Sequence, residues 1–423
     1  MRMMGKGGVA ILPASPAKVR NRDVEYYYRQ DSDFYYLTGF AEPEAVVVLV
    51  PGRPNGEYVL FCRERDPERE TWDGQRAGTG DAVAEYGADD AFPISDIDEI
   101  LPGIIEQCER VYYSMGRHSD FDQRLISWVS TLRERGSSGG HAPDEFITLD
   151  QILHDLRLYK SRAEISAMRK SAKIAVQAHK RAMAVCRPGM YEYELEAEFQ
   201  HEFRRKGTRL SYLPIVGSGP NSCILHYINN DRQMRDGELV LVDAGCEYDY
   251  YASDVTRTYP VNGRFTPEQR TIYDIVLEAH GMALQAIAPG RHWNEAHDAA
   301  VQVVTRGLQN LGFLKGSLPT LIRDGAYRRF FMHRTGHWLG MDVHDVGDYK
   351  VAEHWRMLEP GMVMTVEPGI YIAENSRGVP KCWHGIGVRI EDDILVTRDG
   401  YEILSRNLPR APEEVEAMVG HHG

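Results

Sequence analysis

The sequence has few cysteines, no long apolar run and no excess of positive charge. Its six cysteines among 423 residues form no Cys-x-x-Cys pair, so we expect reduced thiols in a cytoplasmic protein. The absence of about 18 consecutive apolar residues argues against a membrane-spanning helix, and the N-terminal apolar segment is too short for a signal peptide. With 49 basic against 62 acidic side chains, we expect neither nucleic acid nor an anionic membrane as a partner.

A chain of this length predicts two domains rather than one core. Residues 1–155 have the pattern of an α/β domain, with strands over 45–50, 57–62 and 111–114 and a helix over 120–135. The Pro51–Gly56 segment between the first two strands is typical of a hairpin turn. Glycines and serines predict a flexible loop at 136–140, and residues 146–160 connect to the second domain.

Residues 156–423 contain a weak internal repeat. Two helices, over 161–185 and 191–206, are followed by an apolar strand that ends on Asp243, and helices over 267–287 and 293–311 precede a strand that ends on Glu367. The pattern predicts two pseudo-symmetric helix-helix-strand-strand halves, which gives the whole chain an α/β (α+β) fold class. A crevice shared by the halves is a natural place for a site.

The stretch 239–259 carries the first two candidate site residues. An apolar strand ends on Asp243, and a turn leads to a second β-rich run with Asp254. A buried carboxylate without a partner costs several kcal/mol, roughly, and Arg257 could neutralise only one of the two. The pair therefore indicates either a cation site between inward-facing acids, or one turn-capping acid and one solvated acid.

Three more residues favour the cation site. Glu367 ends an apolar strand, Glu391 is expected inside the strand 385–393, and His337 lies in a loop between Gly336 and Gly340, which allow close backbone approach. Oxygen ligands favour Mn²⁺ or Mg²⁺, and the imidazole also admits Zn²⁺, Co²⁺ or Fe²⁺. Two carboxylates about 4 Å apart repel by roughly 4 kcal/mol at an effective dielectric near 20, which two divalent ions would relieve. Such an ion pair lowers the pKa of a bridging water, which predicts a hydrolase.

Three further histidines could contribute to the reaction. They are His226, His333 and His344, in segments expected to flank the crevice. Each alone is more often a packing or surface residue. The spacing of His333 and His337 is that of a zincin helix, but Arg334 stands where that motif needs glutamate, and we reject it.

Together the motifs around Asp243, Asp254, His337, Glu367 and Glu391 resemble the "pita-bread" metallopeptidases. The motifs at 20–25, 30–40 and 69–78 are similar to the N-terminal part of that family's aminopeptidase P branch, so the resemblance covers nearly the whole chain. It implies an enzyme that releases the N-terminal residue from peptides with proline in second position. It also implies two divalent ions, with Mn²⁺ as first choice, and a homo-oligomer, either a dimer or a tetramer.

The resemblance also implies roles for individual residues. Asp254, His337, Glu367 and Glu391 would hold one metal ion, and Asp243, Asp254 and Glu391 the other, with a bridging hydroxide as nucleophile. Glu367 would act as general base and His344 would stabilise the tetrahedral intermediate. The remaining assignments are His226 and His333 for the proline subsite, and Tyr371 and Arg389 for groups around the metals.

Other functions stay open at this point. Prolidase, which cleaves only Xaa-Pro dipeptides, differs in how the site closes around the product carboxylate. A non-catalytic peptide-binding module would be expected to lose ligands, and all five are present. Hydrolysis like that of creatinase, without metals, fits the acidic set poorly.

Overall fold

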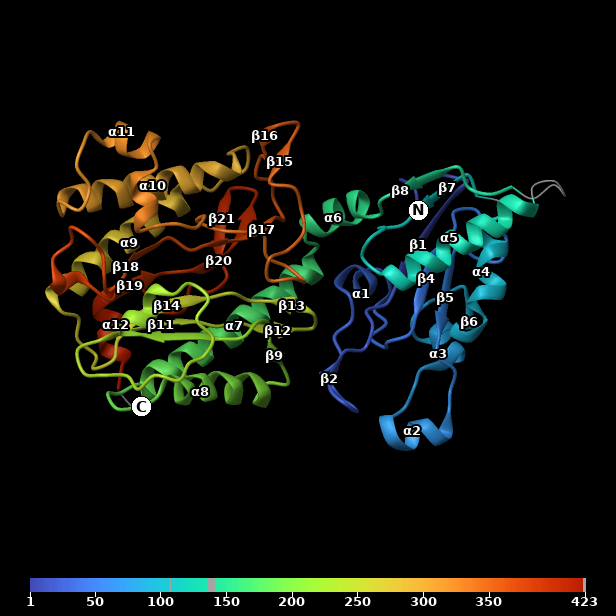
Figure 1. The fold of residues 1–423 in the computed structure, drawn as a ribbon, viewed down its shortest axis with the longest axis horizontal. Coiled ribbons are helices and arrows are strands. Elements are labelled where there is room, and N and C mark those ends of the chain that lie inside the picture. The colour runs from blue at the N-terminus through green and yellow to red at the C-terminus, as the bar shows by residue number, and fades with distance from the viewer. Residues whose placement is uncertain (107, 136–140, 421–423) are drawn as a thin grey trace. The chain divides into compact units, whose positions relative to one another are not determined.

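The computed structural model describes residues 1–106, 108–135 and 141–420, which form two compact units, Met1–Leu153 and His154–Gly423. The predicted flexible loop at 136–140 lies outside the described residues. Figure 1 labels the elements, and each unit is described by itself. No helix in the described part of the chain is both long and apolar enough to cross a bilayer.

A mixed sheet forms the centre of the first unit. Its strand order is β6-β5-β4-β1-β7-β8, in which β1 pairs antiparallel with β4 and parallel with β7. The strands are β1 (Gly8–Pro13), β4 (Val46–Leu49), β5 (Tyr58–Cys62), β6 (Asp90–Pro93), β7 (Arg110–Tyr112) and β8 (Glu145–Ile147), with a separate hairpin of β2 (Val19–Asn21) and β3 (Val24–Glu25). The predicted strands at 45–50, 57–62 and 111–114 are therefore present, with small shifts at their ends.

Both faces of this sheet are covered. Val46 and Val48 pack toward α4 (Ile97–Ile105) and α5 (Ser119–Glu134), whereas Val47 faces the core with α1 (Ser32–Thr38) and α3 (Gly78–Ala84). The alternation follows from the two-residue period of a strand. α2 (Pro67–Asp73) has no buried residues.

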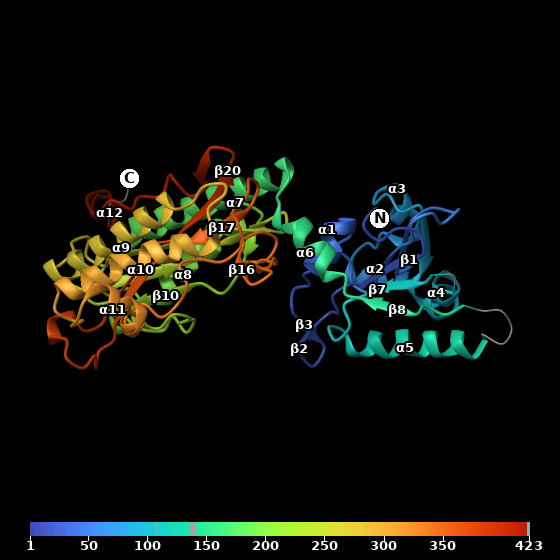
Figure 2. The ribbon, with the colours of Figure 1, turned by 90° about the horizontal axis from the view of Figure 1, so that it is seen from above.

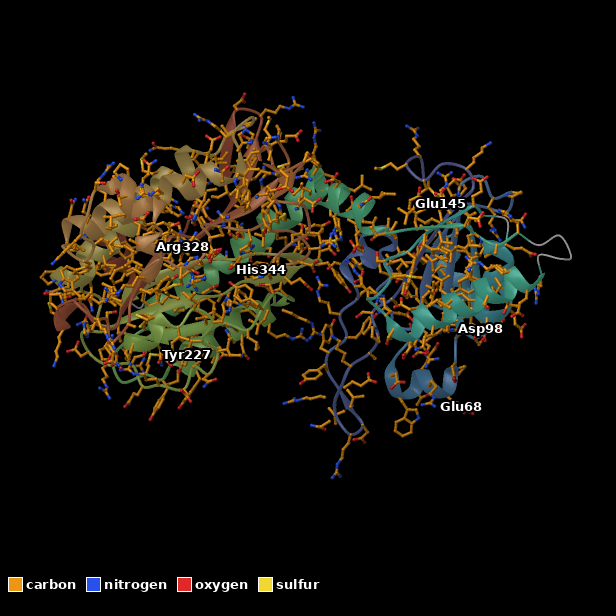
Figure 3. All side chains as sticks on the ribbon, turned by 45° about the horizontal axis from the view of Figure 1, so that its top comes forward. Glu68, Asp98, Glu145, Tyr227, Arg328 and His344 are labelled. Carbon is orange, nitrogen blue, oxygen red and sulfur yellow. The ribbon has the colours of Figure 1, made fainter. Side chains whose placement is uncertain are left out.

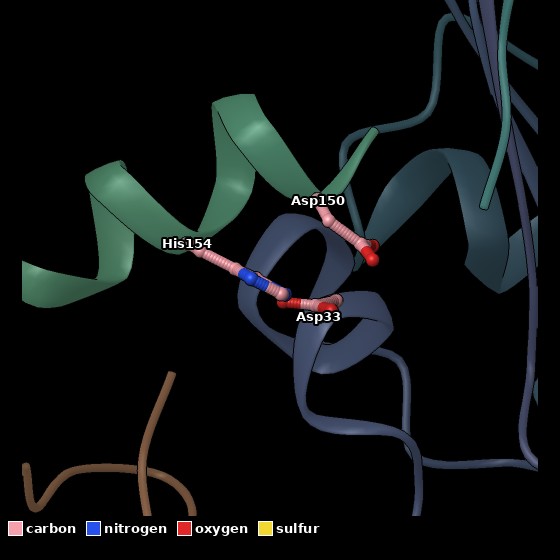
Figure 4. Close-up of side chains that lie close together, drawn as sticks. All are labelled: Asp33, Asp150 and His154. Carbon is pink, nitrogen blue, oxygen red and sulfur yellow. The ribbon is translucent and has the colours of Figure 1, made fainter. Parts of the chain in front are cut away.

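Two carboxylates at the edge of the first unit share one cation. Arg117 lies 3.1 Å from Asp33 and 3.2 Å from Asp150, measured between guanidinium nitrogens and carboxylate oxygens. Figure 4 shows these acids on α1 and at the start of α6 (Asp150–Leu158), with His154 one turn further along α6. The guanidinium therefore contacts both acids.

The second unit has two helix pairs with strands between them. The helices are α7 (Arg162–Val185), α8 (Glu192–Arg205), α9 (Pro267–Gln285), α10 (Trp293–Asn310), α11 (Leu318–Arg323) and α12 (Pro412–Met418). α9 and α10 lie side by side in both views of the ribbon (Figure 1, Figure 2). The predicted helices are all present within two residues at each end, and α7 and α9 start with a capping box at Ser161 and Thr266.

Short sheets of two or three strands accompany these helix pairs. Their orders are β10-β11-β14, β13-β12-β9, β17-β20-β21 and β18-β19, with a hairpin β15-β16. The bounds are β9 (Arg209–Leu210), β10 (Ile215–Ser218), β11 (Leu239–Asp243), β12 (Cys246–Tyr248), β13 (Tyr251–Ala252), β14 (Thr256–Pro260), β15 (Lys350–Val351), β16 (His354–Trp355), β17 (Val363–Val366), β18 (Gly369–Ile372), β19 (Ile386–Arg389), β20 (Asp392–Thr397) and β21 (Gly400–Ile403).

Each half of the second unit has its own apolar core. Val240 and Val242 of β11 pack with α7 and α8, while Val366 of β17 and Val388 of β19 pack with α9 and α10. Because adjacent residues of a strand face opposite sides, the polar ends of these strands are free to meet between the halves. The second unit thus has the two successive groups of helices and strands that the internal repeat predicts.

Candidate metal centre

Strand ends bring four carboxylates together. Asp243 is the last residue of β11, Asp254 precedes β14, and Glu367 directly follows β17. Glu391 lies directly before β20, and its N–H donates to the carbonyl of Thr256 at 3.1 Å, which joins the two halves. The apolar strands are held by their cores, so the acids occupy fixed positions where the strands stop.

The expectation that Glu391 lies inside a strand is wrong. Ile390 and Glu391 separate β19, which pairs with β18, from β20, which pairs with β17 and β21. The apolar pattern continues through this point because the chain stays buried while it changes its pairing partner. Burial alone therefore could not reveal the break.

His337 enters the same place from a loop. Its Nε2 lies 3.2 Å from Asp254 Oδ2 and 3.6 Å from Glu367 Oε1. A Cβ atom on Gly336 would stand 2.1 Å from the carbonyl oxygen of Thr365, so the close backbone approach expected of this glycine is present. Asp254, His337 and Glu391 each offer one ligand atom, and these atoms all lie within 4.8 Å of one another.

One cavity of about 390 Å³ contains the predicted site. All five predicted metal ligands line it, as do Arg389 and the three additional histidines, His226, His333 and His344. Tyr371 does not line the cavity but contacts its wall, because its hydroxyl lies 2.8 Å from His333 Nε2 and accepts from Arg389 Nη1 at 3.0 Å. The structure thus brings the whole predicted set into one neighbourhood.

The carboxylates carry more negative charge than their protein neighbours neutralise. Burial raises the pKa of Glu367 to about 7 and, with the neighbouring carboxylates, raises the pKa of Glu391 well above its ordinary value. Burial also raises the pKa of Asp243, although Arg389 Nη2 donates to its Oδ2 at 2.6 Å. Such a set favours a cation, because each positive charge would relieve several repulsions at once.

Without a metal ion, a protonated imidazole of His337 supplies part of this positive charge. Although burial opposes the charged form, the contacts with Asp254 and Glu367 raise the pKa of His337 to about 9. Burial likewise opposes ionisation of Asp254, but the hydrogen bond with His337 outweighs it and the pKa of Asp254 is lowered. The Nδ1 atom of His337 donates to the carbonyl of Trp338 at 2.9 Å, which directs Nε2 toward the acids.

Tyr212 belongs to the site and was not found from the sequence. Its hydroxyl lies 2.5 Å from Asp243 Oδ1 and 2.6 Å from Asp254 Oδ1. The hydroxyl has one proton, so it donates fully to only one of the two carboxylates at a time. A tyrosine between Ser211 and Leu213 gives no spacing signal, and only the fold reveals its position.

Arg257, which could have neutralised one of the two aspartates, pairs with another carboxylate. Arg257 is fully buried and its Nη2 lies 2.7 Å from Asp392 Oδ1, on the side of β14 away from the acids. Thr256, its neighbour in the strand, faces the site and donates to Glu391 Oε2 at 2.6 Å. Arg389, which the family resemblance placed among the groups around the metals, is the residue that forms an ion pair with Asp243.

The additional histidines differ in exposure. Burial lowers the pKa of His333 to about 3, so its ring is neutral. Burial also lowers the pKa of His344, whose ring centroid lies 4.4 Å from that of His337. His344 is on the loop after Trp338 in the second unit (Figure 3), and His226 is exposed at the rim of the cavity.

A mixed α/β fold that gathers four acids and an imidazole in one cavity is typical of metal-dependent hydrolases. The sequence matches that class: residues 166–398 match the profile of Metallopeptidase family M24, and residues 1–112 match the Aminopeptidase P N-terminal domain. The chain belongs to metallopeptidase family M24. The family resemblance and the fold class predicted from the sequence are confirmed.

Individual relatives match almost the whole chain. The Xaa-Pro aminopeptidase of Escherichia coli (strain K12) is 47% identical over 99% of this chain and 95% of its own length. The structure of Pseudomonas aeruginosa aminopeptidase PepP has a TM-score of 0.97 and 60% identity, over 99% of this chain and 95% of that one. A variant of Escherichia coli aminopeptidase P in complex with substrate has a TM-score of 0.95 and 47% identity, over 98% and 94%.

Proposed function

We propose that the protein is an Xaa-Pro aminopeptidase, which releases the N-terminal residue from peptides with proline in second position. The observation that supports this most strongly is the cavity in which Asp243, Asp254, His337, Glu367 and Glu391 converge. It occurs in a chain 47% identical, over 99% of its length, to an Escherichia coli protein of that name.

The residues fit a pair of divalent cations. Four carboxylates and one neutral imidazole would be balanced by two such ions, and the oxygen-rich donor set favours Mn²⁺, with Zn²⁺, Co²⁺ or Fe²⁺ as alternatives. Asp254, His337, Glu367 and Glu391 would hold one ion and Asp243, Asp254 and Glu391 the other. When bound, the ions supply Lewis-acid activation of a water molecule for attack on the peptide carbonyl.

Glu367 is the proposed general base. Its Oε1 lies 3.6 Å from His337 Nε2 and its Oε2 lies 3.6 Å from His333 Nδ1. The carboxylate therefore lies between the proposed ligand His337 and His333 of the proposed proline subsite. From there it would take a proton from the attacking water and give it to the leaving proline nitrogen. Tyr371 and Arg389 hold the wall behind it through their mutual hydrogen bond of 3.0 Å.

The three additional histidines have two proposed roles, stabilisation of the reacting carbonyl oxygen and contact with the proline ring. His344, whose ring centroid lies 4.4 Å from that of His337, would stabilise the carbonyl oxygen that becomes negative during attack. The neutral ring of His333 and the rim residue His226 would contact the pyrrolidine ring of proline. Proline is accepted because its tertiary amide has no N–H to satisfy, and the acids would receive the free α-amine of the substrate.

Cleavage assays with matched peptides test this proposal. With Mn²⁺ added, we expect release of the first residue from an Xaa-Pro-Yaa tripeptide and no release from Xaa-Ala-Yaa. Cleavage restricted to Xaa-Pro dipeptides would instead identify a prolidase. Absence of cleavage of both classes, by protein that binds Mn²⁺, would refute the proposed activity.

The cellular location and assembly belong to the same proposal. All six cysteines are free thiols, and this supports the proposed location in the cytoplasm, where thiols stay reduced. We propose a homo-oligomer, a dimer or a tetramer, on the basis of the family resemblance. Light scattering of the purified protein tests the assembly, and a monomeric mass would contradict it.

A further inference from the structure

A buried cluster of charges lies outside the proposed catalytic cavity. Arg157 Nη2 contacts Asp345 Oδ1 at 2.6 Å, and Lys160 Nζ contacts Asp345 Oδ2 at 2.9 Å. These three side chains are only 2%, 1% and 1% exposed. The same Arg157 nitrogen lies 2.7 Å from Asp342 Oδ2. None of the four residues lines the cavity.

The cluster needs an explanation because buried ion pairs are a poor source of stability. Removing a charged group from water costs roughly several kcal/mol per ion. A protein in which apolar side chains of similar volume replace a buried ion pair is often at least as stable. Burial raises the pKa of Asp345, but Lys160 and Arg157 outweigh this effect and the pKa is lowered, so the carboxylate is ionised. Asp345 thus contacts two cations, and Arg157 contacts two carboxylates.

Asp345 is connected to the metal ligand His337 through one carbonyl group. The N–H of Asp345 donates to the carbonyl oxygen of Trp338 at 2.9 Å. The same oxygen accepts from Nδ1 of His337, also at 2.9 Å. A carbonyl held in this way fixes the rotation of the imidazole, because Nε2 then points to Asp254.

Asp345 is also connected to His344, which precedes it in the chain. The rings of His344 and His337 lie 4.4 Å apart between centroids and meet at 73°. A movement of Asp345 would therefore move both histidines: one through the Trp338 carbonyl and the other through the backbone.

The loop is fitted closely around the cluster. A Cβ atom on Gly340 would stand 2.1 Å from Asp345 Oδ2 and 2.9 Å from Lys160 Cε. The backbone N–H of Lys160 donates to the carbonyl of Gly361 at 2.9 Å, shortly before β17, which leads to Glu367. The segment that follows α6 is thus tied both to the histidine loop and to the approach of a ligand strand.

We propose that Arg157, Lys160 and Asp345 are positioning residues, which hold His337 in the orientation for metal binding and His344 in the orientation for catalysis. This inference rests on the proposed function, because it assumes that His337 binds a metal ion. It assigns to the buried charges a role in geometry that an apolar cluster could not fill, since two cations and two carboxylate oxygens define directions as well as distances.

Replacement of the central carboxylate gives the direct test. In Asp345→Asn, one amide group faces two cations, so the loop shifts and the Trp338 carbonyl is no longer fixed. We expect the Kd for Mn²⁺, measured by isothermal titration, to rise about tenfold, at the lower end of the range for groups that orient metal-bound histidines. We expect kcat for an Xaa-Pro-Yaa peptide to fall about tenfold with KM within a factor of about two.

A second variant and a stability control separate positioning from folding. Lys160→Met keeps the apolar stem and removes the ammonium, and the same changes in Kd and kcat are expected on a smaller scale. Leu195→Ala, in the core of α8, lowers thermal stability without contacting the site, so its Kd and kcat should equal those of the wild type.

The outcomes distinguish this inference from the proposed function. If Asp345→Asn and Lys160→Met lose only thermal stability, as Leu195→Ala does, the positioning role is refuted. If the wild type binds Mn²⁺ but cleaves no Xaa-Pro peptide, while Asp345→Asn still weakens Mn²⁺ binding, the proposed activity fails and the positioning role stands.

Discussion

Arg389, the last residue of β19, donates from Nη2 to Oδ2 of Asp243, the last residue of β11, at 2.6 Å. The two residues belong to different halves of the second unit, and both side chains are largely buried, with 5% and 12% exposure. The contact therefore joins the halves. It neutralises Asp243 but not Asp254, Glu367 or Glu391, which also line the cavity.

The first prediction concerns this contact. Arg389→Met leaves Asp243 buried without its cation, which should lower the free energy of unfolding of the metal-free protein by about 3 to 5 kcal/mol. Mn²⁺ should recover much of the loss, because it supplies positive charge at the same carboxylates. Urea unfolding with and without Mn²⁺ measures this, and an equal loss under both conditions would contradict it.

The second prediction concerns removal of the metal. Dialysis against a chelator should abolish peptide cleavage, and Mn²⁺ should restore it. The melting temperature should also rise with Mn²⁺ concentration, because binding to the folded state alone adds RT ln(1 + [L]/Kd) to its stability. A melting temperature that is insensitive to Mn²⁺, Zn²⁺ and Co²⁺ alike would argue against the metal centre.

The third prediction concerns Glu367, the proposed general base. Glu367→Gln keeps the size of the side chain and removes its capacity to accept a proton, so kcat should fall by a factor of about 10² to 10⁴. Glu374→Gln is a matched control on an exposed glutamate nearby in sequence, and it should keep wild-type turnover. Wild-type kcat in Glu367→Gln would remove the assignment.

The fourth prediction uses a buried histidine that does not line the cavity. His179 is fully buried against Phe199, its Nε2 lies 3.1 Å from the carbonyl oxygen of Ala244, and burial lowers its pKa from 6.5 to about 3. Between these pH values the unfolded chain binds a proton that the folded chain does not bind. Stability therefore falls as pH decreases below 6.5, and above 6.5 this group has no effect.

His179→Gln retains a donor for the Ala244 carbonyl but does not titrate. Its free energy of unfolding should depend less steeply on pH between 6.5 and 4.5, by up to about 1.4 kcal/mol per pH unit. Denaturant unfolding of metal-free wild type and variant across that range gives the difference in slope. Parallel curves would show that His179 contributes nothing to acid sensitivity.

The sequence revealed the site where acids end apolar strands. Asp243 and Glu367 stand out because a strand core fixes their position while their charge is out of place in an apolar run. Helix bounds were also predictable, since Ser161 and Thr266 begin helices with capping boxes. These features depend on neighbours in the sequence.

What the sequence could not reveal depends on distant partners. Tyr212 meets Asp243 and Asp254 only after β11 and β14 have paired, and the choice of Arg389 over Arg257 as the partner of Asp243 depends on which face of each strand is inward. The break at Glu391 arises from a change of pairing partner within a continuously buried segment.

The most direct test of the account is anomalous X-ray scattering at the manganese edge from crystals grown with Mn²⁺. The account predicts two peaks per chain, about 3.5 to 4 Å apart, among Asp243, Asp254, His337, Glu367 and Glu391. A cavity without peaks in crystals of protein that cleaves Xaa-Pro peptides, or peaks bound only by other residues, would contradict it.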